Sequence, residues 1–236
     1  MSDFDRNVAA YPGAARTVAV DAGLRAHMIR VYNYMAGGVA LTGLVAYFTN
    51  AYFGQALYGS PMMYVLIFAP LALVFFLSWR IESLSASTAR ALFFIYAALL
   101  GASLSIIFAV YTEASITRVF FISAAAFAGL SLWGYTTQRD LTGMGSFMMM
   151  GLIGIILASL VNIFLKSSGL DWIISMIGVV VFAGLTAWDT QKIKEMYDVN
   201  DDGTVSGRKA VMGALSLYLD FINLFLMLLR LFGDRR

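Results

Sequence analysis

The sequence predicts an all-α integral membrane protein with seven transmembrane helices. Hydrophobic residues make up 60% of the 236 residues, and only 13% are charged, against roughly 25% in soluble domains. The mean hydropathy is +0.78. The charged residues cluster between apolar runs, and each run reaches the roughly 20 residues that cross about 30 Å of hydrocarbon. Several such runs cannot all form the core of one water-soluble domain.

Seven apolar runs define the predicted spans. They cover residues 28–50, 62–79, 90–111, 118–135, 145–165, 172–189 and 209–232. Residues 1–27 are polar and are predicted to form an amino-terminal tail. Residues 28–232 then form a single transmembrane domain, and residues 233–236 form a short carboxy-terminal tail. The four tryptophans fall at span ends, as is typical of an interfacial aromatic belt: Trp79, Trp133, Trp172 and Trp188.

The distribution of basic residues predicts the orientation. Cytoplasmic segments of membrane proteins carry an excess of Lys and Arg. With seven crossings and a cytoplasmic amino terminus, the outer segments hold Arg118, Lys166, Arg230, Arg235 and Arg236. The inner segments hold the remainder of the 16 basic residues, which favours this orientation. The alternative is that the last segment re-enters the membrane and returns.

Small residues recur at four-residue spacing in two of the predicted spans. Ala97, Gly101 and Ser105 form one such series, and Ala125 and Gly129 form another. This spacing is typical of helices whose backbones approach closely in lipid. We interpret both series as packing positions rather than functional ones.

Asp220 is the clearest candidate functional residue. It lies eleven residues beyond Lys209, about 16 Å into the last span, where an ionised side chain costs roughly 2.5–3.5 kcal/mol. Ser216 and Asn223 share its helical face at i−4 and i+3. Such residues persist in membranes when they face the protein interior or a water path, so we expect this face to point inward.

Asp189, at the end of the sixth predicted span, is the second candidate. Thr186 lies three residues earlier on the same face, and Lys192 follows at i+3, so an ordinary interfacial carboxylate is an equally open interpretation. If Asp189 faces Asp220, the two carboxylates share a proton or a cation, because close carboxylates do not both ionise cheaply. Arg80, at the inner end of the second span, is a cation that could reach either aspartate; its alternative is a plain positive-inside role.

The sequence lacks the residues that several other classes of function require. The chain has no cysteine and one histidine, which disfavours thiolate or histidine metal sites, and no cofactor motif appears. A net charge of +2 argues against nucleic acid as a partner. The loop after Asp198 starts like a calcium loop, but Lys209 stands where the twelfth-position glutamate belongs. We do not expect an enzyme.

Three segments closely resemble the Bax inhibitor-1 family, in particular its bacterial inner-membrane branch. They are residues 217–230 (LYLDFINLFLMLLR), 187–193 (AWDTQKI) and 134–141 (GYTTQRDL). The resemblance implies six helices around a central seventh, and a pH-sensitive calcium leak in the cell (inner) membrane. It also implies that Asp189 and Asp220 form the sensor and bind the ion, with Arg80 as a latch. Ala69 stands near a position where some relatives carry an acid.

The leading hypothesis is therefore a cation (calcium) leak channel or carrier gated by protonation of Asp189 and Asp220. The alternative is a membrane interaction protein that regulates a partner, such as a membrane protease or a cell-death factor. In that case the tail Ser2–Arg25 and the loop Lys194–Arg208 would carry the function. A small-solute transporter is less favoured, because the spans hold few binding groups.

Overall fold

The protein is an all-helical bundle in the described part of the chain. The computed structural model describes the backbone of residues 12–236 and the side chains from residue 22, so residues 1–11 of the predicted tail lie outside it. In chain order the helices are α1 (Pro12–Leu57), α2 (Pro61–Arg80), the 3-10 turn η1 (Ile81–Ser83), α3 (Ala86–Leu104), the single turn α4 (Ile107–Val110), α5 (Glu113–Thr136), α6 (Thr142–Leu165), α7 (Ser168–Glu195) and α8 (Gly203–Phe232).

Six helices are long and apolar enough to cross a membrane: α2, α3, α5, α6, α7 and α8. Large apolar side chains cover their outer surfaces; Phe75 is 72% exposed and Phe164 is 86% exposed. So much contiguous apolar surface suits contact with lipid rather than water. The first predicted span lies in α1, which is not among the six, and polar residues such as Asn33 and Asn50 interrupt its apolar sequence.

Several helices extend beyond the predicted spans. The helix α1 already begins at Pro12, and α8 begins at Gly203 because Asp202 Oδ1 accepts hydrogen bonds from the backbone N–H groups of the first turn. The helix α7 continues six residues past Asp189, to Glu195. Hydropathy reports where lipid contact begins, whereas capping and local hydrogen bonds decide where a helix begins.

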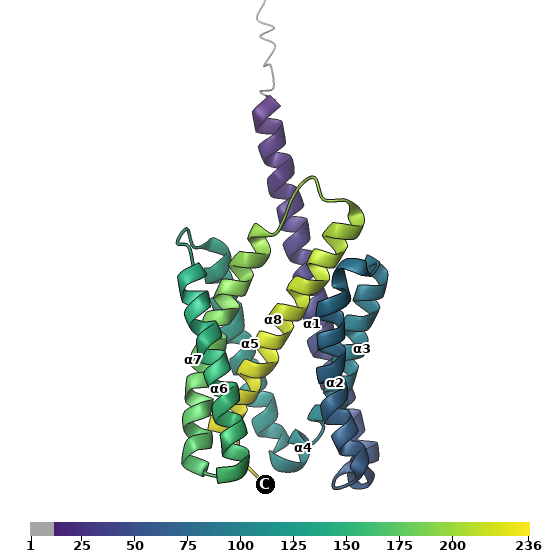
Figure 1. Ribbon diagram of the computed structural model, residues 1–236, viewed down its shortest axis with the longest axis vertical. Helices are drawn as coiled ribbons and strands as arrows, with labels where there is room; N and C mark the ends of the chain where they lie inside the picture. The colour runs from purple at the N-terminus through teal and green to yellow at the C-terminus, as the bar shows by residue number, and fades with distance from the viewer. Residues whose placement is uncertain (1–11) are drawn as a thin grey trace, which may run out of the picture.

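The last helix, α8, lies at the centre of the bundle. It packs against α7, α1, α5 and α3, and 72% of its most apolar stretch is buried, against 6% for α6. Figure 1 shows α8 crossing the bundle diagonally, with the carboxy terminus at the end opposite the start of α1. Residues 233–236 are held there, since Asp234 pairs with Arg118 at 3.0 Å.

The two series of small residues differ in whether another helix packs closely against them. A β-carbon at Gly101 would lie 2.6 Å from the backbone oxygen of Thr42, so α1 and α3 do approach closely at this position. At Gly129 nothing lies within 4 Å, so this glycine does not mediate a close helix contact in the described structure. The spacing alone does not tell whether a neighbouring helix is present.

Candidate functional site

Asp220 lies in the middle of the central helix and is buried. Its exposure is 4%, and its Oδ2 atom has no hydrogen-bond partner among residues 22–236. Burying a carboxyl oxygen without a partner is costly. Asp220 therefore points inward as expected, whereas Ser216 and Asn223 on the same face are partly exposed. The carboxyl group is left able to bind a proton, a water molecule or an ion.

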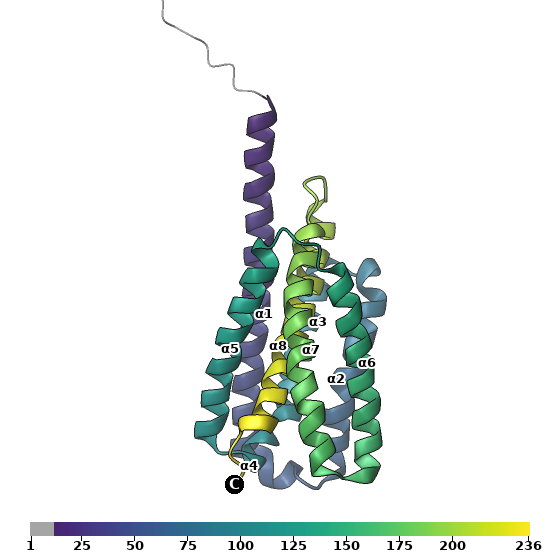
Figure 2. The ribbon, with the colours of Figure 1, turned by 90° about the vertical axis from the view of Figure 1, so that its left-hand side faces the viewer.

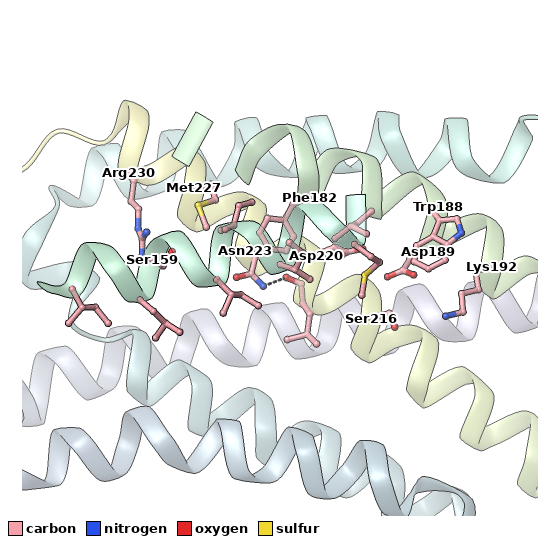
Figure 3. Close-up of a pocket in the computed structure, with 18 residues that line it drawn as sticks. Ser159, Phe182, Trp188, Asp189, Lys192, Ser216, Asp220, Asn223, Met227 and Arg230 are labelled. Atoms are coloured by element: carbon pink, nitrogen blue, oxygen red, sulfur yellow. Dashed lines mark hydrogen bonds between the residues drawn. The ribbon is translucent and has the colours of Figure 1, made fainter. Parts of the chain in front are cut away.

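A cavity of about 620 Å³ lies between α6, α7 and α8, and both aspartates line it (Figure 3). We call it the aspartate cavity. Its walls are mostly apolar, so its few polar groups determine what it can bind. Those groups are Ser159, Asp189, Lys192, Ser216, Asp220, Asn223 and Arg230.

Asp189 is half-buried on α7 and lines the same cavity as Asp220. The side chain of Lys192, one turn further along α7, also lines this cavity and lies 5.0 Å from the centre of the Trp188 ring. Figure 3 shows Asp220, Asp189 and Lys192 following one another along the cavity. Despite the difference in depth expected from the sequence, both aspartates line this one cavity, and α8 crosses the bundle at a tilt (Figure 1).

A second cavity, of about 610 Å³, reaches Asp189, but not Asp220, from the side of the α7–α8 loop. It lies among η1, α7 and α8 and includes Glu82 and Arg208. We call it the loop-side cavity. Asp189, Lys192 and Ser216 line both cavities, so Asp189 stands where the two meet. Asp220 lines only the aspartate cavity.

The predicted supporting residues divide into two groups. Ser216 lines both cavities, and Asn223 lines the aspartate cavity while its Nδ2 donates to the Leu219 carbonyl at 2.8 Å. Thr186 is fully buried but lines neither cavity, and its hydroxyl donates to the Phe182 carbonyl of its own helix at 2.8 Å. A residue three positions from Asp189 shares its face only approximately.

Arg80 is not brought to the aspartate pair in this structure. It is exposed at the end of α2, lines neither cavity, and forms no ion pair with either aspartate in the described chain. Lys192 is instead a basic group that lines both cavities together with Asp189. The latch role of Arg80 stays a prediction.

Two polar elements of the site do not follow from the sequence. Ser159 enters from α6, which no pattern in the chain links to the aspartates. At the far end of the cavity Arg230 lies 3.7 Å from Asp171. In the sequence this pair is indicated only by position. Asp171 is near the start of α7 and Arg230 near the end of α8, and these ends of two consecutive antiparallel helices lie on the same side of the bundle.

The donor set suits a loosely held cation better than a tightly bound metal. No group of three or more His, Cys, Asp or Glu side chains gathers within the described residues. Calcium takes six to eight oxygen ligands, and here two carboxylates, with Ser216 and Asn223 nearby, supply part of such a shell. Water would have to supply the rest.

Comparison with known proteins gives one consistent result over nearly the whole chain. The family model described as "Inhibitor of apoptosis-promoting Bax1" matches residues 24–236. The inner membrane protein YbhL of Escherichia coli is 49% identical over 231 residues, covering 96% of this chain and 99% of that protein. An uncharacterized protein of Rickettsia prowazekii is also 49% identical, over 92% of both chains.

Proposed function

The chain belongs to the Bax inhibitor-1 family of membrane proteins, and we propose that it is a pH-sensitive cation leak, with calcium as the cargo, rather than an enzyme. The observation that carries the proposal is the buried carboxyl of Asp220, which has an oxygen without a partner among residues 22–236 and shares one cavity with Asp189. Such a pair inside the bundle of a multi-pass protein offers a site where a cation can bind transiently without contact with lipid.

The chemistry of the pair supports pH sensitivity. Two close carboxylates in a poorly solvated space do not both stay ionised unless a cation lies between them. A proton and a metal ion therefore compete for the same two groups. At low pH protonation of the pair removes the charge that attracts the cation, and it also weakens the attraction between Asp189 and Lys192.

We further propose that all seven long helices cross the membrane, α1 included, with the amino terminus in the cytoplasm. The connections α2–α3, α5–α6 and α7–α8 lie at one end of the bundle (Figure 1), and they carry Arg80, Arg139 and Arg208 there. An excess of basic residues at this end supports its assignment to the cytoplasm. The loop-side cavity then opens towards the cytoplasm.

Calcium flux into proteoliposomes, measured at two pH values, tests the leak. We expect Asp220→Asn to abolish the pH dependence, because the amide keeps the shape of the carboxyl but does not titrate. The matched control is Asp198→Asn, which changes an exposed loop aspartate and should keep the wild-type profile. An unchanged pH profile in a monodisperse Asp220→Asn protein would falsify the proposal.

A second candidate function is regulation of a membrane protein partner without transport. The amino-terminal part of α1 supports it, because this part extends beyond the end of the bundle (Figure 1) and offers a helix free for another chain. Deleting residues 2–21 separates the two functions. Loss of partner binding with flux intact favours the partner role, and intact binding counts against it.

A further inference from the structure

A third cavity lies on another flank of the bundle, away from the aspartates. It has a volume of about 540 Å³ and runs along the seam between α1 and α5, which lie side by side in Figure 2. We call it the α1–α5 groove. From α1 it is lined by Arg25, Met28, Ile29, Tyr32, Met35 and Ala36, and from α5 by Phe127, Ala128, Ser131, Leu132 and Tyr135.

The groove exists because α1 and α5 both pack against α8 but hardly against each other. Ala36 and Ala128, both small, line its inner end. One hydrogen bond bridges it, between the Tyr32 hydroxyl and Ser131 Oγ at 2.6 Å. Since Ser131 Oγ also contacts the Thr190 hydroxyl at 2.9 Å, the hydroxyls of Tyr32 and Ser131 are already hydrogen-bonded.

The groove has the length of one lipid leaflet. From Arg25 to Ala36 it follows eleven residues of α1, or about 16 Å at 1.5 Å per residue. Half of a roughly 30 Å hydrocarbon core is about 15 Å. The lining below Arg25 is mostly apolar. Its floor is buried, since Met28 is 3% exposed, whereas its edges face outward, since Ile29 is 50% exposed and Leu132 is 63% exposed. A ligand here must therefore present a long apolar chain.

The mouth of the groove is basic. Arg25 lines it and is exposed. Lys194 stands beside it, because its Nζ donates to the Tyr135 carbonyl at 3.1 Å and lies 5.4 Å from the centre of the Tyr135 ring. No acidic side chain is among the residues that line the groove. Arg25 and Lys194 at the mouth of an apolar groove are complementary to a lipid with a negatively charged headgroup and an apolar acyl chain.

We infer that the α1–α5 groove binds one anionic phospholipid of the leaflet on the loop side, with an acyl chain between α1 and α5 and its phosphate at Arg25 and Lys194. The site is separate from the aspartate cavity, so this inference does not depend on the proposed leak. The bound lipid would fill the seam that the protein's own side chains leave open.

Native mass spectrometry of the delipidated full-length protein tests the inference. The probes are phosphatidylglycerol and phosphatidylcholine with the same acyl chains, each added in turn. We expect wild-type protein to retain one phosphatidylglycerol at a concentration at least tenfold below that needed for phosphatidylcholine. Equal retention of the two lipids would overturn the assignment of an anionic ligand.

Two variants and a control locate the site. Ala128→Phe should fill the groove and lower retention of phosphatidylglycerol at least tenfold, whereas Ala126→Phe, exposed on another face of α5, should leave it unchanged. Arg25→Gln alters no packing and should reduce the preference for phosphatidylglycerol over phosphatidylcholine. Wild-type retention in Ala128→Phe, or a preserved preference in Arg25→Gln, would refute the site.

Discussion

Replacing Gly101 by alanine measures how tightly α1 and α3 are packed. The new β-carbon would lie 2.6 Å from the Thr42 carbonyl oxygen and 3.0 Å from its Cα, whereas an ordinary contact begins at 3.4 Å. Both contacting atoms belong to the backbone, so the helices must part by roughly 0.8 Å, the difference between 3.4 and 2.6 Å. Thr42 is also hydrogen-bonded to α3 and α8, so the strain reaches the central helix. Overpacking of this kind costs about 1–3 kcal/mol.

Gly43→Ala is the matched control, because it changes the residue next to Thr42 and its β-carbon would meet nothing within 4 Å. Both substitutions gain about 0.5–1 kcal/mol of helix stability from reduced backbone freedom, so their difference isolates the clash. We expect the Tm of Gly101→Ala in detergent to lie on the order of 2–12 °C below that of Gly43→Ala. The measurement is the fraction that stays monodisperse in size-exclusion chromatography after heating. An equal or higher Tm refutes the close packing.

Two further predictions concern buried polar groups. His27, just before the first predicted span, is 3% exposed with neither ring nitrogen hydrogen-bonded in the described structure, and burial lowers its pKa from 6.5. Since the unfolded chain binds this proton more readily, stability should fall by up to about 1.4 kcal/mol per pH unit below pH 6.5, down to the folded pKa. His27→Phe should flatten that decline in Tm between pH 7.5 and 5.5, and an unaltered slope would contradict the assignment. Thr42 Oγ1 donates to the Ala97 carbonyl at 2.9 Å, so the Tyr218 hydroxyl must donate to Thr42 at 2.6 Å. Tyr218→Phe should therefore cost about 1 kcal/mol, and Thr42→Val about 1–3 kcal/mol because it strands a buried donor; the reverse order in thermal unfolding would refute this direction.

The membrane class and the inward position of Asp220 could be predicted because both depend on the cost of polarity in lipid. Apolar runs of sufficient length identified six of the helices, and a carboxyl in mid-span has few tolerable positions other than the interior. That Asp189 and Asp220 line one cavity does not follow from the sequence, since it depends on the tilt of α8 and on the continuation of α7 to Glu195. Neither the tilt of α8 nor the length of α7 can be read from the hydropathy of the sequence.

The remaining parts of the site depend on which helices are neighbours. Ser159 reaches the aspartate cavity only because α6 packs on α7. Thr186 has a suitable helical position but hydrogen-bonds within its own helix, which periodicity does not reveal. Likewise Gly101 and Gly129 look alike in the sequence, yet only Gly101 meets another backbone.

The outer wall of the aspartate cavity is α6, which packs chiefly on α7 and turns most of its surface to lipid. A helix held mainly by one neighbour can shift sideways without disturbing the core around α8. In the proposed leak, a cation would pass between α6 and the two aspartates, so the position of α6 would set the width of its path. The bilayer against which α6 rests would then affect the leak as well as the charge of the aspartates.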